Sequence, residues 1–361
     1  MPLIAYQTAH GCNDYPLHFA FFEALERRGI LDHYDFALDP MVDYPYCGKL
    51  MKRFPQLHLT EHYSWPRTAM RWMRSHVGRF YRPLGMLDRF DAVCEGCGGH
   101  IHPHYLKSGV FRAYPRVRRR AILFQSIEDG ALANDEVRES IAQTDLIIAR
   151  TDESAKRAKA AGAKRVVESC DIVFSHQPRE IPERAGIAVA LRVPNQDPGP
   201  QYLAELRRAL EHLRGLGGDV DFVQVEGRIG QEMRQWTALA GVCGSKSVYH
   251  GDDMYIPFSC RRQAIISARL HTTILALLHG NRAILQFQIE EHTHKMAEML
   301  RDIGLTSLVV RPRDALNTET MSSFLASPEV IGEREVECAL TEARRRVETG
   351  LDAFEEWLES I

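Results

Sequence analysis

The chain has 361 residues, of which 45% are hydrophobic and 26% charged, and its formal net charge is −3. This length and composition suit two globular domains, each with its own core, and they exclude a disordered chain. The eight cysteines lack the paired spacings of a disulfide framework or a zinc site. The sequence contains neither the pattern of a signal peptide at its start nor an apolar run of about 18 residues. We therefore expect a cytoplasmic protein.

The N-terminal half alternates strand-like and helix-like segments. Strands are predicted over residues 3–7, 91–94, 121–125 and 145–149. A helix over residues 16–28 begins with a proline and ends at Gly29, and a second helix over residues 151–162 has acids in its first turn and lysines later. Strands that alternate with helices predict an α/β fold with a mostly parallel sheet.

The segment 175–184 interrupts this alternation with two prolines and many polar residues, which predicts a domain boundary there. We place one domain at residues 1–180 and a second at 186–330. The second domain repeats the layout of the first, with a strand over 186–191 that ends in Arg192, a helix over 201–214 and a strand over 220–225. Residues 331–361 predict a C-terminal helix with one apolar stripe, which we expect to pack back across both domains.

The most informative segment covers residues 264–305. It predicts a strand over 264–267, a helix over 272–279, a strand over 283–287 and a helix over 292–303. In such a parallel unit the ligand crevice lies outside the carboxyl ends of the strands, where helix N-termini attract anions. Ser267, Arg269, His271 and Lys295 are expected to face that crevice, so the sequence predicts a site for an anionic ligand.

Arg192 would join Arg269 and Lys295 at the same sheet edge, where charge-assisted hydrogen bonds could hold a small polyanion. Each arginine alone could equally stabilise a contact within the sheet or between domains. His271, at a junction between a strand and a helix, could cap the helix or serve as a general acid. These alternatives stay open on the residues alone.

Four segments in this order suggest a family. They are I-A-R-T-D-E-S-A-K-R-A-K-A-A-G, C-D-I-V-F, G-I-A-V-A-L-R and I-S-A-R-L-H, the last followed by an apolar helix, a glycine, a strand and Lys295. Over residues 90–305 the chain resembles the polysaccharide pyruvyl transferase family. The resemblance implies two Rossmann-like domains in a glycosyltransferase-B-like arrangement. It also implies transfer of pyruvate from phosphoenolpyruvate to sugar hydroxyls as a ketal, with Arg192, Arg269, His271 and Lys295 binding or activating this donor.

On this hypothesis the N-terminal domain holds a saccharide acceptor, which could be linked to a lipid. Asn13, Gly98, Gly99, His100 and His102 are the expected acceptor contacts, although Gly11-Cys12-Asn13-Asp14-Tyr15 departs from the Gly-Asn-x-Gly-Asp turn of the family.

His271 is the expected acid in the reaction and Asp14 the expected base, and Asp14 could instead cap the helix that begins at Pro16. Three alternate histidines begin at His100 and could chelate a metal, but no further ligand pattern completes a site. We expect neither a metal nor another cofactor.

Between Arg67 and Arg120 the sequence has 12 basic residues against three acids, interleaved with aromatic residues. This stretch could contact an anionic membrane surface, or it could be an ordinary solvated face. The rival enzyme of the same architecture is a glycosyltransferase that uses a nucleotide sugar. A non-enzymatic binder of nucleic acid is the alternative from another class, and it would bind with a steep dependence on salt.

Overall fold

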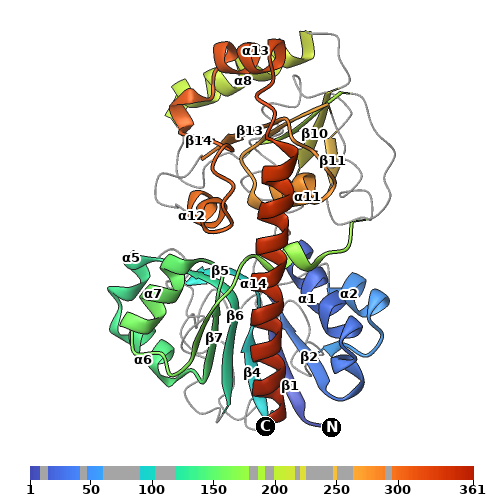
Figure 1. Ribbon diagram of the computed structural model, residues 1–361, viewed down its shortest axis with the longest axis vertical. Helices are drawn as coiled ribbons and strands as arrows, with labels where there is room; N and C mark the ends of the chain where they lie inside the picture. Colours follow the sequence, from blue (N-terminus) through green and yellow to red (C-terminus); the bar gives the residue numbers. More distant parts are fainter. Residues whose placement is uncertain are drawn as a thin grey trace. The chain divides into compact units, whose positions relative to one another are not determined.

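The computed structural model describes residues 1–8, 15–40, 47–59, 90–101, 119–178, 186–191, 199–215, 220–224, 247–249, 263–288 and 295–361. The chain divides into two compact units (Figure 1). Unit 1 comprises Met1–His176 and Ala343–Ile361, and unit 2 comprises Gln177–Glu342.

Sheet A of unit 1 has the strand order β3-β2-β1-β4-β6-β7-β8, and β5 pairs with β6. Every described pair of strands in it is parallel. The strands are β1 (Leu3–Thr8), β2 (Asp35–Pro40), β3 (His58–Leu59), β4 (Ala92–Glu95), β5 (Gly98–Ile101), β6 (Arg120–Ile127), β7 (Leu146–Ala149) and β8 (Val166–Glu168). Strands β2 and β3 lie on one side of β1 and the later strands lie on the other, so the direction of winding reverses between β1 and β4.

The helices of unit 1 pack apolar and aromatic side chains against this sheet. They are α1 (Tyr15–Arg27), η2 (Ile30–Asp32), α2 (Cys47–Arg53), α5 (Asp129–Leu132), α6 (Asp135–Gln143), α7 (Asp152–Ala160) and η5 (Ile172–Ser175). Phe21 and Phe22 of α1 are fully buried beside Tyr6 of β1. Helix α7 begins where the sequence predicts, because the Thr151 side chain accepts a hydrogen bond from the Ser154 amide.

The long C-terminal helix α14 (Glu333–Glu359) contributes its second half to unit 1, where it lies along sheet A (Figure 1). Its Phe354 ring lies 5.5 Å from that of Phe21. At Gly350 the helix comes so close that a Cβ atom there would lie 2.8 Å from Ser169 Oγ and 3.0 Å from Phe124 Cε1. The predicted return of the C-terminal helix is thus confirmed, and a glycine permits the close approach.

Sheet B of unit 2 has the order β11-β10-β9-β12-β13-β14, and all its described strand pairs are parallel. The strands are β9 (Ile187–Ala190), β10 (Val220–Gln224), β11 (Ser247–Tyr249), β12 (Ala264–Ser267), β13 (Ile284–Phe287) and β14 (Val310–Arg311). Numbered within the unit, this order is 3-2-1-4-5-6, which is the Rossmann order. The helices are α8 (Gly199–Gly215), α11 (Leu270–Leu278), α12 (Lys295–Asp302), η6 (Arg313–Ala315) and α13 (Thr318–Ala326).

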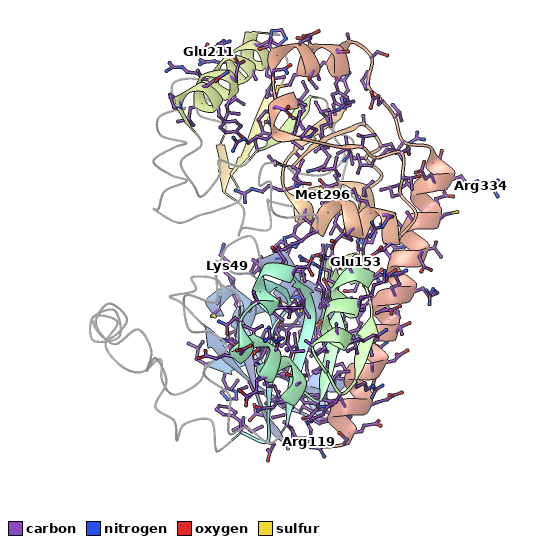
Figure 2. The ribbon with its side chains drawn as sticks, turned by 90° about the vertical axis from the view of Figure 1, so that its left-hand side faces the viewer. Lys49, Arg119, Glu153, Glu211, Met296 and Arg334 are labelled. Atoms are coloured by element: carbon purple, nitrogen blue, oxygen red, sulfur yellow. The ribbon has the colours of Figure 1, made fainter. Side chains whose placement is uncertain are left out.

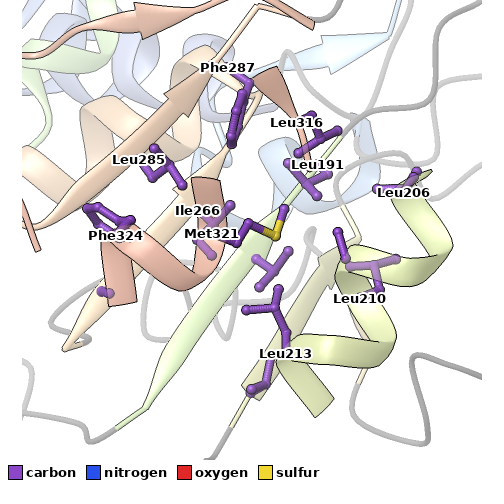
Figure 3. Packing of buried hydrophobic residues seen from close by; sticks show 14 of the residues in the cluster. Leu191, Leu206, Leu210, Leu213, Ile266, Leu285, Phe287, Leu316, Met321 and Phe324 are labelled. Atoms are coloured by element: carbon purple, nitrogen blue, oxygen red, sulfur yellow. The ribbon is translucent and has the colours of Figure 1, made fainter. Parts of the chain in front are cut away.

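Alternation along the strands of sheet B divides its residues between two faces. Val189, Ile266, Leu285 and Phe287 point to one face, where they form a core with α8 and α13 (Figure 3). The intervening residues, among them Ser267 and Gln286, point to the other face. Figure 2 shows the side chains around the sheet, with Glu211 marking α8 and Met296 marking α12.

The predicted fold class, two Rossmann-like units with mostly parallel sheets, is confirmed. The sequence analysis missed several elements, namely β2, α2, β3, β5, α5, α6, β8, β11, β14 and α13. It also began the helix of the predicted site two residues after the true first residue, Leu270. Within the described parts of the chain, no helix combines the length and the apolar character needed to cross a membrane.

Candidate functional site

The carboxyl ends of β9 and β12 form the switch point of sheet B, where successive connections leave in opposite directions. Ala190, at the end of β9, pairs in register with Ser267, at the end of β12, and Ser267 pairs with Gln286 of β13. The amide of Ala268 continues the pairing by donating to Ala190 O at 2.8 Å. The switch point thus leads directly into the segment Ser267–His271.

Hydrogen bonds hold this segment in a fixed turn. The Ser267 hydroxyl accepts from the Arg269 amide and donates to Arg269 O, both at 3.0 Å. The Thr273 hydroxyl, one turn into α11, lies 3.1 Å from Arg269 O and also donates to Gln286 Oε1. The Ser267 side chain is therefore directed into the turn, where it fixes the backbone of Arg269.

Helix α11 presents a favourable N-terminus for an anion. Its N-cap residue Arg269 makes no side-chain capping bond, and no acid occurs in its first turn. By contrast, α6, α7 and α13 are capped by Asn134, Thr151 and Asn317, and each has acids in its first turn. Because an anion complements the helix dipole, the lack of acids and of a side-chain cap at the start of α11 suits an anion better than the N-termini of these three helices.

Two basic side chains accompany this N-terminus. Arg269 is 5% exposed and His271 is 9% exposed, so both are largely removed from solvent. A guanidinium in such surroundings interacts more strongly with an anion than it would on the surface, because water screens the charges less. The turn can therefore bind a phosphate or a carboxylate and can stabilise charge that develops on a departing group.

Lys295 is the first residue of α12, which follows β13 in the chain. Since β13 is the neighbour of β12, the topology places the beginning of α12 at the same edge of sheet B. Arg192 lies outside the described residues, directly after the segment that β9 begins. The structure thus brings Ser267, Arg269 and His271 together in one turn, and the ligand contacts of these residues, Lys295 and Arg192 stay predictions.

The structure describes only some of the residues that were predicted to bind the acceptor or to act as the base. Asn13, Asp14 and His102 lie outside the described residues. Gly98 and Gly99 belong to β5, and so does the backbone of His100. Residues 98–101 pair with β6 as a short parallel strand, and the acceptor contacts of Gly98, Gly99 and His100 stay predictions.

The switch point of sheet A holds a buried polar cluster that the sequence analysis did not find. Tyr6 of β1 contacts His18 Nδ1 at 2.8 Å and donates to Cys97 Sγ at 3.6 Å. Burial raises the pKa of the Tyr6 phenol well above its ordinary value, and burial likewise raises the pKa of the Cys97 thiol. A protonated phenol and thiol at this position suit hydrogen bonding rather than nucleophilic chemistry.

The cluster depends on a close approach by Gly96. A Cβ atom at Gly96 would lie 2.3 Å from Gln7 O and 2.7 Å from the Tyr6 ring. The sequence shows a glycine directly before Cys97. Only the pairing of β1 with β4 shows that this glycine lies against Tyr6 and Gln7. Thr273 and Gln286 were also missed, and Gln286 could have been noticed as a polar residue inside an apolar strand.

No group of three or more potential metal ligands occurs among the residues that the structure describes. Most of the basic stretch Arg67–Arg120, which suggested contact with a membrane, lies outside them.

No protein-family model matches the sequence, and no curated protein matches it. Solved structures match over the whole chain at low identity. A Staphylococcus aureus MnaA–UDP co-structure aligns with a TM-score of 0.61 and 11% identity, over 100% of this chain and 98% of that one. The UDP-GlcNAc 2-epimerase of Neisseria meningitidis, bound to UDP-GlcNAc, aligns with a TM-score of 0.61 and 11% identity, over 99% and 100%.

Phytolacca americana UGT2, complexed with UDP-2-fluoro-glucose and pterostilbene, aligns with a TM-score of 0.52 and 10% identity, over 99% of this chain and 100% of that one. The chain therefore has the glycosyltransferase-B fold, abbreviated GT-B, that glycosyltransferases and epimerases share.

Proposed function

We propose that this protein is an enzyme that binds a nucleoside diphosphate sugar at the carboxyl edge of sheet B and transfers its sugar. The observation that carries the proposal is the turn Ser267–His271, which joins an uncapped helix N-terminus to two largely buried basic side chains at the switch point of a Rossmann sheet. Three structures of this fold hold UDP or a UDP sugar, which supports a nucleotide of this kind as the ligand.

In this proposal the amides at the start of α11 and the guanidinium of Arg269 bind the diphosphate. When the bond between the sugar and the diphosphate breaks, negative charge grows on the departing phosphate oxygen. His271 can donate a hydrogen bond to that oxygen, and Lys295 can neutralise part of the charge. A hydroxyl of the acceptor then forms the new bond to the sugar and gives up its proton, and Asp14 is the predicted base.

Pyruvyl transfer from phosphoenolpyruvate is the second candidate. The R-L-H sequence at the start of α11 supports it, because Arg269 and His271 stand at the first turn without an acid. A carboxylate there would suit the hydroxyl groups of a sugar nucleotide, whereas two basic groups suit a small anionic donor. In this reaction His271 would protonate the methylene carbon of phosphoenolpyruvate, and two sugar hydroxyls would add at the neighbouring carbon as phosphate leaves.

Isothermal titration calorimetry with UDP, UDP-GlcNAc and phosphoenolpyruvate separates these candidates. We expect UDP to bind and Arg269→Ala to weaken its affinity about ten-fold or more, because a charge-assisted hydrogen bond contributes about 1.5–3 kcal/mol. The matched control is Arg207→Ala in the same unit, where an exposed arginine pairs with Glu211 at 3.1 Å on α8. Binding of phosphoenolpyruvate without UDP would favour pyruvyl transfer, and equal UDP affinity in both variants would remove Arg269 from the site.

A further inference from the structure

The buried strand β13 contains one polar residue, Gln286, at a position where an apolar residue is expected. Gln286 occupies the third position of β13, between Leu285 and Phe287, and it is completely buried. It points to the face of sheet B that α11 covers. A buried amide without partners would destabilise the fold, so the presence of this one requires specific hydrogen bonds.

Gln286 has these bonds, and they lead to the predicted donor site. Its Oε1 accepts the proton of the Thr273 hydroxyl, and its Nε2 donates to Phe287 O at 3.0 Å. Thr273, which is also fully buried, stands in the first turn of α11 and fastens that turn to β13. The connection thus runs from the interior of the sheet to the beginning of the helix.

Counting donors and acceptors shows which hydroxyl donates to which oxygen in the rest of the network. A threonine hydroxyl has one proton, and the Thr273 proton has three possible acceptors: Gln286 Oε1, Arg269 O at 3.1 Å and Ser267 Oγ at 3.3 Å. Because Arg269 O already accepts from the Ser267 hydroxyl at 3.0 Å and from the Thr273 amide at 3.2 Å, the Thr273 hydroxyl proton goes to Gln286 Oε1. The Ser267 hydroxyl then supplies the donor to Arg269 O at 3.0 Å. Because Gln286 accepts the Thr273 proton, the hydroxyl that donates to Arg269 O is that of Ser267.

We propose that Thr273 and Gln286 are positioning residues that hold the Arg269–His271 turn in its ligand-binding conformation. The inference rests on the proposed function of this turn, and it adds two residues that touch no ligand. Removal of the link should allow the first turn of α11 to move relative to β12, and the amides of the turn would then no longer converge on one anion.

The test compares Thr273→Val, Gln286→Leu and the double variant. Thr273→Val leaves the buried Gln286 Oε1 without its donor, so we expect this variant to melt several degrees below wild type. In Gln286→Leu the Thr273 hydroxyl can still donate to Arg269 O at 3.1 Å, so the loss should be smaller. The double variant removes both partners, which can be nearly neutral, so its melting temperature should recover. Thr144→Val is the matched control, because Thr144 is fully buried in unit 1 and its hydroxyl bonds Ser140 O at 2.8 Å.

Two readouts separate positioning from stability. UDP titrations at 15 °C should give an affinity at least five-fold weaker than wild type in the double variant and an unchanged affinity in Thr144→Val. Amide hydrogen exchange of peptides that cover residues 264–280 should be faster in the double variant, although its melting temperature has recovered. UDP affinity within two-fold of wild type, or unchanged exchange over these residues, would overturn the inference.

The proposed function and the positioning role fail separately in this experiment. If wild type binds neither UDP nor phosphoenolpyruvate, the proposed function fails, and hydrogen exchange without ligand still decides whether Thr273 and Gln286 hold the turn. If wild type binds UDP and the double variant binds it equally well, the function stands and the network only stabilises the fold.

Discussion

Arg150 and Asp171 form an ion pair at the carboxyl edge of sheet A, with 3.1 Å between Nη1 and Oδ2 and almost no solvent exposure on either side chain. Arg150 follows β7, and its Nε also donates to Ser126 Oγ at 2.9 Å. Asp171 additionally accepts from the Val173 amide at 3.0 Å. Each charge is thus compensated inside the protein, which is the condition for burying it.

The first prediction follows from this pair. Arg150→Met should lower the free energy of unfolding by about 3–5 kcal/mol, because it leaves the Asp171 carboxylate buried without its partner. Arg165→Met is the control in the same unit, since it removes an exposed pair with Glu356 that should contribute less than about 1 kcal/mol. Urea denaturation followed by circular dichroism measures both. Equal losses in the two variants would contradict this reading of the buried pair.

The second prediction concerns the close approach of α14. Gly350→Ala should destabilise the protein by about 1–3 kcal/mol, because the new methyl would overlap Ser169, Ile148 and Phe124, and this overpacking exceeds the roughly 1 kcal/mol that alanine gains over glycine in a helix. Gly48→Ala in α2 meets no atom within 4 Å and should be neutral or stabilising. Thermal unfolding compares the two, and a stabilised Gly350→Ala would show that α14 lies farther from sheet A.

The third prediction is a pH dependence in unit 2. Hydrogen bonds from the Ser307 hydroxyl and amide lower the pKa of Glu335 below its ordinary value. A lowered pKa in the folded state adds stability above the unfolded pKa, about 4.3, and this stability disappears as the pH falls through the folded value.

Glu335→Gln should therefore melt below wild type at pH 7, and the difference should vanish near pH 3. Glu337→Gln, at an exposed acid of the same helix, is the control. A melting difference for Glu335→Gln that persists unchanged at pH 3 would exclude the ionised carboxylate as its cause.

The fourth prediction concerns Arg28, which ties α14 to unit 1. Its guanidinium binds Glu348, Asp352 at 2.8 Å and Glu355 at 2.9 Å. Arg28→Met should destabilise the protein by about 1–2 kcal/mol at low salt, because the three acids then repel one another. The loss should shrink in 1 M NaCl, where the screening length is about 3 Å. A loss that is independent of salt would assign the effect to packing of the arginine stem.

The sequence located most elements because their patterns are local. Gly29, which has a φ of 71°, ends α1 where it was expected, and Thr151 caps α7 through a bond within its first turn. Helix α6 was missed, although Asn134 caps it in the same way, because its segment is short and mostly polar. Helix α13 lies beyond the last predicted strand. Its residues Met321 and Phe324 are buried in a core shared with α8, and the sequence does not show this packing.

For the site, the sequence correctly placed Ser267 at a strand end and Arg269 and His271 at the following helix start. The bonds between Ser267 and Arg269 are local, but the sequence analysis placed the Ser267 side chain in the crevice instead of the turn. It could not show that Thr273 bonds Gln286, because these residues belong to α11 and β13, which meet only in the tertiary structure. The cluster of Tyr6, His18 and Cys97 was invisible for the same reason. Its members join only when β1 and β4 pair.

Three features could be predicted from neighbours along the chain: the alternation of strands and helices, the division into two α/β halves, and the basic residues that follow a buried strand. Tertiary structure alone decided the strand order, and with it the switch points, the buried Arg150–Asp171 pair and the link from Gln286 to the donor turn. The physical reason is that hydrogen bonds and ion pairs need atoms about 3 Å apart, and only the packing of distant segments brings these atoms together.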